Sequence, residues 1–269
     1  MAHLSLESLG QDPDAAQEAC GTFAFTAAPP PREDIPHLFL DPDHRFQSFL
    51  GMGAAITDAS AEVFARLPEK AQRDLLKACW SPAEGNGYRF CRTSIHSCDF
   101  SSASYTYCDE GDDDLTSFSI APDLRYRIPM IQAAREASGG HLQLLASPWS
   151  APGWMKDTGI MLEGGRLRPE HHGTWARYIT RFLEAWKREG LPFWGLTVQN
   201  EPAATQRWES MLWDGAEERN FLRDHLVPAL ASAGFGDLKV LGWDHNRDLL
   251  PARARALLNG AEGSDVWGI

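Results

Sequence analysis

The chain has 269 residues and a formal net charge of −12, and its 43% hydrophobic and 23% charged residues are typical of a globular domain large enough for a sizeable core. The acidic balance disfavours nucleic acid and anionic membranes as partners, because both repel a negatively charged surface. The five cysteines form no CxxC pair, so neither a zinc site nor a disulfide framework is indicated.

The N-terminus lacks the basic segment and the apolar run of a secretory signal peptide. No run approaches the roughly 20 apolar residues of a membrane span. As written, the chain is expected in the cytoplasm, and a start site upstream of Met1 would change this to a secreted or periplasmic protein. Residues 1–45 are predicted to be an irregular segment, with possible short strands at 21–27 and 37–41 around a proline-rich connector.

From residue 46 to residue 269, strand-like and helix-like segments alternate. The predicted strands are apolar runs at 47–56, 86–95, 141–150, 193–202 and 238–246, and a sixth begins within 264–269. The predicted helices, with apolar residues at helical spacing, cover 67–80, 128–140, 172–190, 217–234 and 248–260. Such alternation implies a parallel sheet covered by helices. An open doubly wound sheet and a (β/α)₈ barrel both fit.

The positions of polar residues favour the barrel. They lie toward the C-terminal ends of the expected strands, at Arg92, at Ser147–Trp149, at Asn200–Pro202 and at Asp244–Asn246. In a (β/α)₈ barrel these strand ends converge on one mouth, where the active site lies. No GxGxxG or GxxxxGK[ST] motif follows the first strand, so a nucleotide-binding open sheet has no support. Residues 46–269 are therefore predicted to be five strand–helix units and the start of a sixth unit of an α/β (β/α)₈ TIM barrel.

Glu201 is the leading candidate for a catalytic residue. A glutamate at a barrel strand end, between Asn200 and Pro202, is typical of a glycosidase acid/base, which must give up a proton to the leaving oxygen and later take one from water. Asn200 could hydrogen-bond to a sugar 2-hydroxyl. The alternative is that these residues form only a loop after a strand.

Four other residues at the strand ends are candidates for substrate binding. Arg92 needs a carboxylate partner if it is buried at the mouth. Asp99 could hold two sugar hydroxyls or cap the next turn. Trp149 could be a core aromatic or a wall for a sugar ring, and for Asp244 a substrate-related role competes with helix capping. The residues alone leave these alternatives open.

Three further features suggest structural roles. The acidic run 108–114 does not match the spacing of a calcium-binding loop and is expected to be a solvated loop. His171 and His172 are adjacent, so they do not share a helix face and are not expected to bind a metal as a pair. Asp58 is expected to cap the helix that follows it.

Long stretches of the sequence resemble the glucosylceramidase-type members of glycoside hydrolase family 30, from about Pro36 to the C-terminus. The stretches are GMGAAITDASAEVF, SCDFSSASYTYCDEGDDD, LLASPWSAPGWMKDTG, HGTWARYITRFLEAW and FWGLTVQNEP. The resemblance implies a retaining β-glycosidase whose barrel carries a side β-sandwich, so residues 1–45 are expected to contain a remnant of that sandwich.

The resemblance also implies roles for individual residues. Glu201 matches the family's general acid/base, and Asn200 matches its partner at the 2-hydroxyl. The other matched positions bind substrate or shape the site, and they are Arg92, Asp99, Trp149 and Asp244. Asp99 and Trp149 correspond to residues that bind glucose hydroxyls in the −1 subsite.

The family's nucleophilic glutamate lies at the end of the seventh strand, whereas the match here reaches only the start of the sixth. We therefore expect no nucleophile in this chain, which suggests a fragment truncated at its C-terminus. The implied function is hydrolysis of a β-glucoside with retention, with glucosylceramide as the first choice. A non-catalytic carbohydrate-binding or inactive protein is the alternative. No metal or organic cofactor is expected, the partner is a carbohydrate or glycolipid, and the oligomeric state is left open.

Overall fold

The computed structural model describes residue 41, residues 43–259 and residues 265–269. The chain divides into two compact units, Met1–Phe49 and Leu50–Ile269. The possible strands at 21–27 and 37–41, and with them the expected sandwich remnant, lie outside the described residues, except for Asp41, which has no regular structure.

The second unit contains a five-stranded parallel sheet in which each strand pairs with the next one along the chain. The strands are β1 (Gly53–Ala55), β2 (Phe90–Ile95), β3 (Gln143–Pro148), β4 (Phe193–Thr197) and β5 (Lys239–Leu241). This sequential order is that of a barrel, because a doubly wound sheet reverses its order at a switch point. The predicted barrel type is confirmed, and the open-sheet alternative is excluded for these strands.

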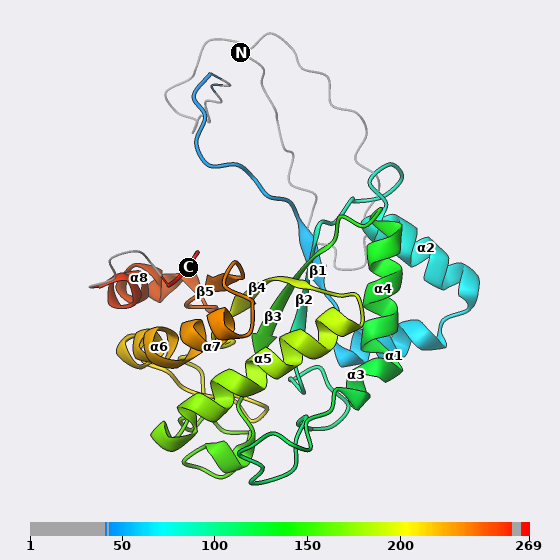
Figure 1. Ribbon diagram of the computed structural model, residues 1–269. Helices are drawn as coiled ribbons and strands as arrows, with labels where there is room; N and C mark the ends of the chain where they lie inside the picture. The colour runs from blue at the N-terminus through cyan, green and yellow to red at the C-terminus, as the bar shows by residue number, and fades with distance from the viewer. Residues whose placement is uncertain (1–40, 42, 260–264) are drawn as a thin grey trace. The chain divides into compact units, whose positions relative to one another are not determined.

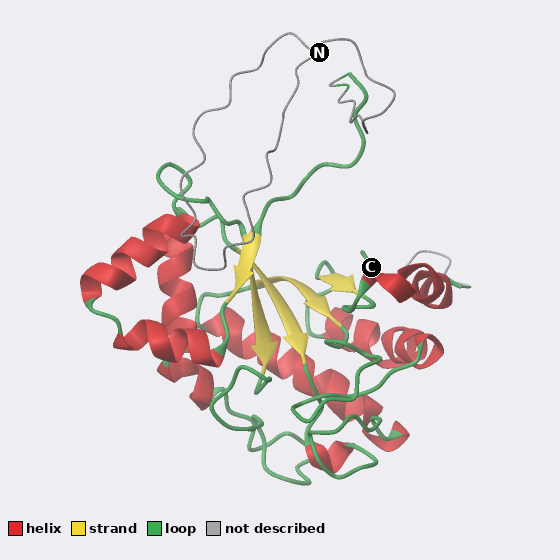
Figure 2. Ribbon diagram, turned by 180° about the vertical axis from the view of Figure 1, so that it is seen from behind, coloured by secondary structure: helices red, strands yellow, loops and turns green. Residues whose placement is uncertain are grey.

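Helices follow the strands along the chain and lie on one side of the sheet. In Figure 1 α5 crosses in front of the strands, and in Figure 2, seen from behind, the strands lie in front of it. The helices are α1 (Asp58–Arg66), α2 (Glu69–Trp80), α3 (Ala121–Arg125), α4 (Arg127–Ala137), α5 (His172–Arg188), α6 (Gly215–Phe221), α7 (Val227–Ser232) and α8 (Leu250–Leu258). Short turns of other helix types are η1 (Gly153–Met155), η2 (Pro169–His171), η3 (Leu222–Leu226) and η4 (Arg247–Leu249).

The main hydrophobic core fills the space between the sheet and the helices. The apolar residues predicted at helical spacing on α5 are fully buried, namely Trp175, Ile179, Phe182 and Trp186. The rings of Phe182 and Trp186 pack on Phe193 of β4, with ring centroids 5.1 and 5.3 Å from that of Phe193. The periodicity of 172–190 therefore identified the face that attaches α5 to the sheet.

The two ends of the sheet differ in how closely they follow the prediction. The first strand was expected over 47–56, but only Gly53–Ala55 pairs with β2. At Gly53 the backbones approach so closely that a Cβ would lie 2.2 Å from the Phe90 carbonyl oxygen. At the other end, the Trp267 amide donates to the Val240 oxygen (2.7 Å), and Gly268 forms a parallel bridge with Leu241. The predicted opening of a sixth strand is confirmed.

Two local predictions need correction. Asp58 is not the cap of α1: the N-cap is Thr57, whose side chain accepts from the Ser60 amide while the Ser60 side chain accepts from the Thr57 amide. Aspartate is generally a strong cap, but here it lies one residue inside the helix. The helix predicted over 217–234 is also divided into α6, η3 and α7, and Pro228 near the start of α7 has no amide hydrogen to donate.

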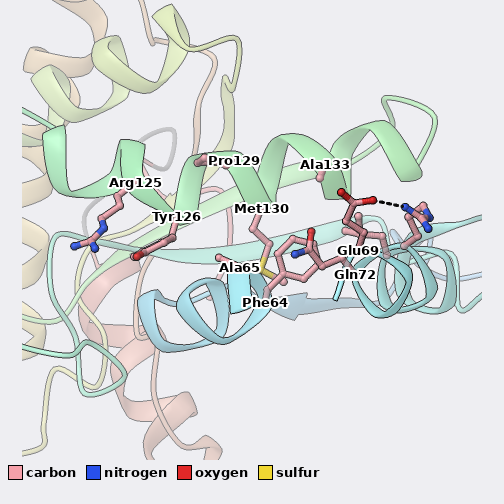
Figure 3. A pocket seen from close by; sticks show the side chains of 11 residues that line it. Phe64, Ala65, Glu69, Gln72, Arg125, Tyr126, Pro129, Met130 and Ala133 are labelled. Carbon is pink, nitrogen blue, oxygen red and sulfur yellow. Dashed lines mark hydrogen bonds and ion pairs between the residues drawn. The ribbon is translucent and has the colours of Figure 1, made fainter. Parts of the chain in front are cut away.

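A groove lies among the outer helices, between α1 and α2 on one side and α3 and α4 on the other (Figure 3). It encloses about 440 Å³, and its lining includes Phe64, Gln72 and Met130. None of the site residues predicted from the sequence lines this groove. No helix within the described part of the chain is long and apolar enough to cross a membrane.

Candidate active site

The backbone turns sharply where three strands end. Left-handed φ angles occur at His96 (48°) directly after β2, at Glu201 (46°) after β4 and at Trp243 (51°) after β5. Such conformations cost a non-glycine residue about 1–3 kcal/mol and persist only where the surroundings hold them. Here each amide is held: the His96 amide donates to the Tyr107 hydroxyl, that of Glu201 to the Asp244 carbonyl, and that of Trp243 to the Glu218 carboxylate.

Arg92 is the centre of a hydrogen-bonded cluster at these strand ends. Its Nε donates to Ser147 Oγ (2.9 Å), and its Nη2 donates to Asn200 Oδ1 (2.9 Å) and to Asp244 Oδ2 (2.5 Å). The expected carboxylate partner of Arg92 is thus Asp244. Their side chains are 29% and 26% exposed, so the pair is open to water at the mouth.

Asp244 binds more than the arginine. Thr197 Oγ1 lies 2.8 Å from Asp244 Oδ2 and 2.8 Å from Ser147 Oγ, and Ser147 Oγ lies 3.2 Å from the same carboxylate oxygen. Asp244 therefore does not act as a helix cap. Its carboxylate instead connects residues of β2, β3 and β4. Thr197 was not among the predicted site residues, although a polar residue at the end of an apolar strand was an available signal.

The backbone of Asn200 and Glu201 is tied to the strands on both sides. The Asn200 amide donates to the Pro148 oxygen (2.8 Å), and the Glu201 amide donates to the Asp244 oxygen (2.8 Å). Buried Gln199, which was also not predicted as a site residue, donates from Nε2 to the Trp149 oxygen (2.7 Å) and the Asn200 oxygen (2.8 Å). The Glu201 carboxylate itself makes no hydrogen bond with the described residues, so the backbone of Glu201 is held while its carboxylate has no partner among them.

Trp149 and Asp99 complete the set of predicted residues. Trp149 is 7% exposed, and the Arg92 guanidinium carbon lies 4.6 Å from the centroid of its ring, which is cation–π distance. Asp99 is exposed in the loop after β2. Desolvation by the surrounding atoms raises the pKa of Asp99, as do the negative charges of Glu201 and Glu209, whereas hydrogen bonding to the Trp149 side chain acts to lower it. All six predicted residues therefore belong to one region, with Asp99 beside the bonded cluster.

A second polar network lies behind the loop that follows β2. Arg127 of α4 is fully buried, and its Nη2 donates to Asp123 Oδ1 (2.5 Å) and to the Tyr107 hydroxyl (2.8 Å). Asp123 Oδ2 accepts from the Tyr107 hydroxyl (2.6 Å) and from Trp186 Nε1 (2.9 Å). Asp58 faces this network, with a carboxylate oxygen 3.5 Å from Arg127 Nε. The network connects α1, α3, α4 and α5, and Arg127 and Asp123 at its centre are buried, whereas Asp58 is 13% exposed.

The acidic run 108–114 and the adjacent histidines His171 and His172 make local structural contacts. Asp112, in the acidic run, accepts hydrogen bonds from the amide and hydroxyl of Ser117 (2.7 and 2.6 Å). His171 pairs with Asp113 (3.0 Å), whereas His172 packs edge-on against Phe221. Within 41, 43–259 and 265–269, no three His, Cys, Asp or Glu side chains converge as a metal site would require.

Comparison with known proteins places this site in a family. Residues 49–269 match the glycosyl hydrolase family 30 TIM-barrel domain. The lysosomal acid glucosylceramidase of Mus musculus is 36% identical over 243 residues, which cover 86% of this chain and 47% of that enzyme. The endo-1,6-beta-D-glucanase neg1 of Aspergillus fumigatus is 31% identical over 234 residues, which cover 80% of this chain and 47% of that enzyme.

Among solved structures, SrfJ from Salmonella typhimurium superposes with a TM-score of 0.78 and 34% sequence identity, over 84% of this chain and 51% of that one. The chain thus spans about half the length of the relatives it matches. The matched region includes β1 to β5 and every residue of the Arg92 cluster.

Proposed function

The chain belongs to glycoside hydrolase family 30, and we propose that it carries the general acid/base and the sugar-binding residues of a retaining β-glucosidase. The observation that carries this proposal is that Glu201 is joined to the Arg92 cluster by the hydrogen bond from its amide to the Asp244 oxygen. Four strand ends contribute to it, and Glu201 is its only member whose side chain makes no hydrogen bond within the described residues.

Glu201 is proposed to act twice. As the acid it protonates the glycosidic oxygen, and as the carboxylate it then removes a proton from the attacking water. The left-handed backbone at Glu201 and the hydrogen bond from its amide to Asp244 support this role, because they restrict where the carboxyl can point. A fixed acid is needed since the proton must move along a defined line to the leaving oxygen.

Asn200 is proposed to bind the sugar 2-hydroxyl through its amide nitrogen. Its Oδ1 is occupied by Arg92 Nη2, which leaves the Nδ2 hydrogens as the free end of the side chain. Arg92 in turn is oriented by Asp244 and Ser147. Replacement of Asp244 would therefore weaken substrate binding indirectly, through Arg92 and then Asn200.

A retaining mechanism needs a second carboxyl group, about 5–5.5 Å from the first, to form the glycosyl-enzyme intermediate. We propose that this nucleophile is a glutamate outside the 269 residues, at the same mouth. The other proposed contacts are Asp99 with hydroxyls of the −1 sugar and Trp149 with its ring.

Glucosylceramide or a related β-glucoside is the first-choice substrate. The similarity to the mouse glucosylceramidase (36%) supports it, and the similarity to the fungal endo-1,6-beta-glucanase (31%) supports β-1,6-linked glucan as the second choice. Both substrates present a β-linked glucosyl unit to the same residues, so they differ at the leaving-group side.

The test uses an aryl β-glucoside, glucosylceramide and a β-1,6-linked gluco-oligosaccharide, with the longer protein that contains these 269 residues and the proposed nucleophile, and with its Glu201→Gln variant. Glu201→Gln is expected to lower kcat about 10²–10⁴-fold, because glutamine cannot donate a proton, while circular dichroism stays unchanged. Glu136→Gln, at an exposed position of α4, is the control. Equal rates for wild type and Glu201→Gln would remove Glu201 from the mechanism. Sugar binding without turnover in either would favour the non-catalytic alternative.

A further inference from the structure

Lys156 is a buried lysine that the mechanism above does not use. It follows η1 in the loop after β3, and 0% of its surface is exposed. Its Nζ donates to Ser150 Oγ (3.1 Å), to the Met161 oxygen (3.1 Å) and to the Ser210 oxygen (2.7 Å). An ammonium group has three hydrogens, so residues of this chain occupy all of its donors and no further segment is needed to complete these contacts.

The contacts of Lys156 fasten two loops to each other. Residues 156–167 after β3 and residues 202–213 after β4 form one unit, which we call the loop platform. Backbone hydrogen bonds along its seam run from the Glu163 amide to the Gln206 oxygen (2.8 Å), from the Ser210 amide to the Met161 oxygen (3.1 Å) and from the Leu212 amide to the Gly165 oxygen (2.8 Å). Lys156 bonds both sides of this seam through one charged group, since Met161 belongs to the first loop and Ser210 to the second. Hydrogen bonds from an ionised donor are stronger than those between neutral groups, so the lysine is a major fastener of the platform.

The loop platform is continuous with Glu201. Its second loop begins at the residue after Glu201, and the Trp213 amide donates to the Pro202 oxygen (2.9 Å), so the two ends of this loop are held together beside the proposed acid. Lys156 holds the same loop through the Ser210 oxygen. A shift of the loop would therefore be transmitted to the backbone that carries the Glu201 carboxyl.

A second connection runs from Lys156 to Trp149. Ser150, the residue after Trp149, accepts from Lys156 at its hydroxyl and from buried His96 Nε2 at its carbonyl oxygen (2.7 Å). The Trp149 oxygen accepts from Gln199 Nε2 (2.7 Å), two residues before Glu201. The lysine thus restrains the segments on both sides of the proposed acid.

We propose that Lys156 is a positioning residue, which fixes the loop platform so that the Glu201 carboxyl is aligned with the leaving oxygen. The proposal rests on the function proposed above, in which Glu201 is the acid. Burial lowers the pKa of Lys156 to about 8, so at about pH 6 the side chain is an ammonium and all three donors are present. Proton transfer depends strongly on geometry, and a displacement of about 1 Å can lower a rate about 10²-fold. Loss of Lys156 should therefore impair protonation of the leaving group more than the other parts of the reaction.

Two substrates separate positioning of the acid from stability of the fold. The phenolate of 2,4-dinitrophenyl β-glucoside leaves with little protonation, whereas phenyl β-glucoside needs the acid. The assay uses the longer protein that contains these 269 residues and the proposed nucleophile, at about pH 6. Lys156→Met should lower kcat/KM for the phenyl glucoside about 10²-fold and that for the dinitrophenyl glucoside much less, and Glu201→Gln should show the same pattern. Lys70→Met, at an 81% exposed position of α2, is the matched control and should change neither value.

Amide hydrogen exchange measured by mass spectrometry reports on the platform itself. The amides of residues 156–167 and 202–213 should exchange faster in Lys156→Met than in wild type, and at the wild-type rate in Lys70→Met. Ser150→Ala removes one of the three acceptors of the lysine, so it should give the same kinetic pattern at smaller size. It serves as the test if Lys156→Met does not fold.

Equal losses on the two glucosides in Lys156→Met, or in Ser150→Ala in its place, would mean that the lysine only stabilises the fold. Unchanged exchange or unchanged kcat/KM would also overturn the positioning role. If Glu201→Gln shows the leaving-group effect and the Lys156 variant does not, the role of Lys156 alone is rejected. If wild type cleaves neither glucoside, or if Glu201→Gln loses equally on both, the proposed role of Glu201 fails, and that of Lys156 fails with it.

Discussion

Arg92 and Arg127 both pair with aspartates, but their surroundings are opposite. The Arg127 side chain is 1% exposed and its partner Asp123 is 0% exposed, whereas Arg92 and its partner Asp244 are 29% and 26% exposed. Arg127 joins helices behind the sheet, and Arg92 joins strand ends at the mouth. The same pair of residue types therefore builds the scaffold in one place and the candidate site in the other.

The difference lies in unused hydrogen-bonding capacity. Around Arg127, Asp123 accepts from Arg127, Tyr107 and Trp186, so neither of its oxygens is left for a ligand. Around Arg92, the free amide end of Asn200 and the Glu201 carboxylate have no partner within the described residues. An arginine network indicates function only where some of its members remain free and exposed.

The largest expected effect is on the stability that the buried network of Arg127 and Asp123 provides. Arg127→Met would leave the Asp123 carboxylate buried without its cation, so the free energy of unfolding should fall by about 3–5 kcal/mol. Urea denaturation followed by circular dichroism measures this. Arg73→Met is the matched control, because Arg73 and its partner Glu69 are 68% and 90% exposed, and its cost should be at most about 1 kcal/mol. Equal losses in the two variants would contradict the distinction between scaffold and surface pairs.

Glu218 of α6 should make the free energy of unfolding depend on pH. It contacts Trp243, the residue before Asp244 of the Arg92 cluster. Its Oε1 accepts from the Trp243 amide (3.0 Å), and burial raises its pKa from 4.5 to about 7. The unfolded chain loses this proton first as the pH rises, so Glu218 lowers stability progressively between pH 4.5 and 7 and keeps it lower above pH 7.

Glu218→Gln removes this titration and keeps an oxygen for the Trp243 amide. The variant should match wild type near pH 4 and exceed its unfolding free energy by about 3 kcal/mol near pH 8. Denaturation curves across this range measure the difference, and Glu136→Gln should give a difference that does not vary with pH. A constant difference for Glu218→Gln would show that its carboxyl is not proton-linked to folding.

The smallest expected effect is on the Arg92 cluster, whose central ion pair is partly exposed. Asp244→Asn removes the charge that orients Arg92, so binding of methyl β-D-glucoside, measured by ligand-observed NMR titration, should weaken about tenfold, the scale of one charged hydrogen bond. The unfolding free energy should change little, since both side chains are partly exposed. Asp224→Asn, in an exposed pair with Arg223, is the control and should affect neither property. A large loss of stability in Asp244→Asn would place this aspartate in the scaffold.

Most of the fold was predictable from local pattern. The apolar runs marked the strands, and the helical spacing of Trp175, Phe182 and Trp186 identified the buried face of α5. Errors occurred where a single neighbour decides the outcome, as at Thr57, which caps α1 in place of Asp58. The extent of β1 was likewise overestimated, because the close approach at Gly53 depends on a partner strand.

The sequence by itself determined the order of strands and helices and the polar residues at the strand ends, because periodicity and turn-forming residues act over a few positions. Only the tertiary structure decided which of those residues meet. Arg92 and Asp244 are 152 positions apart, and Arg92 and Ser147 are 55 apart. No local signal marks Lys156 as buried or turns Asp58 toward Arg127, because burial and charge pairing arise only when distant segments pack together and exclude water.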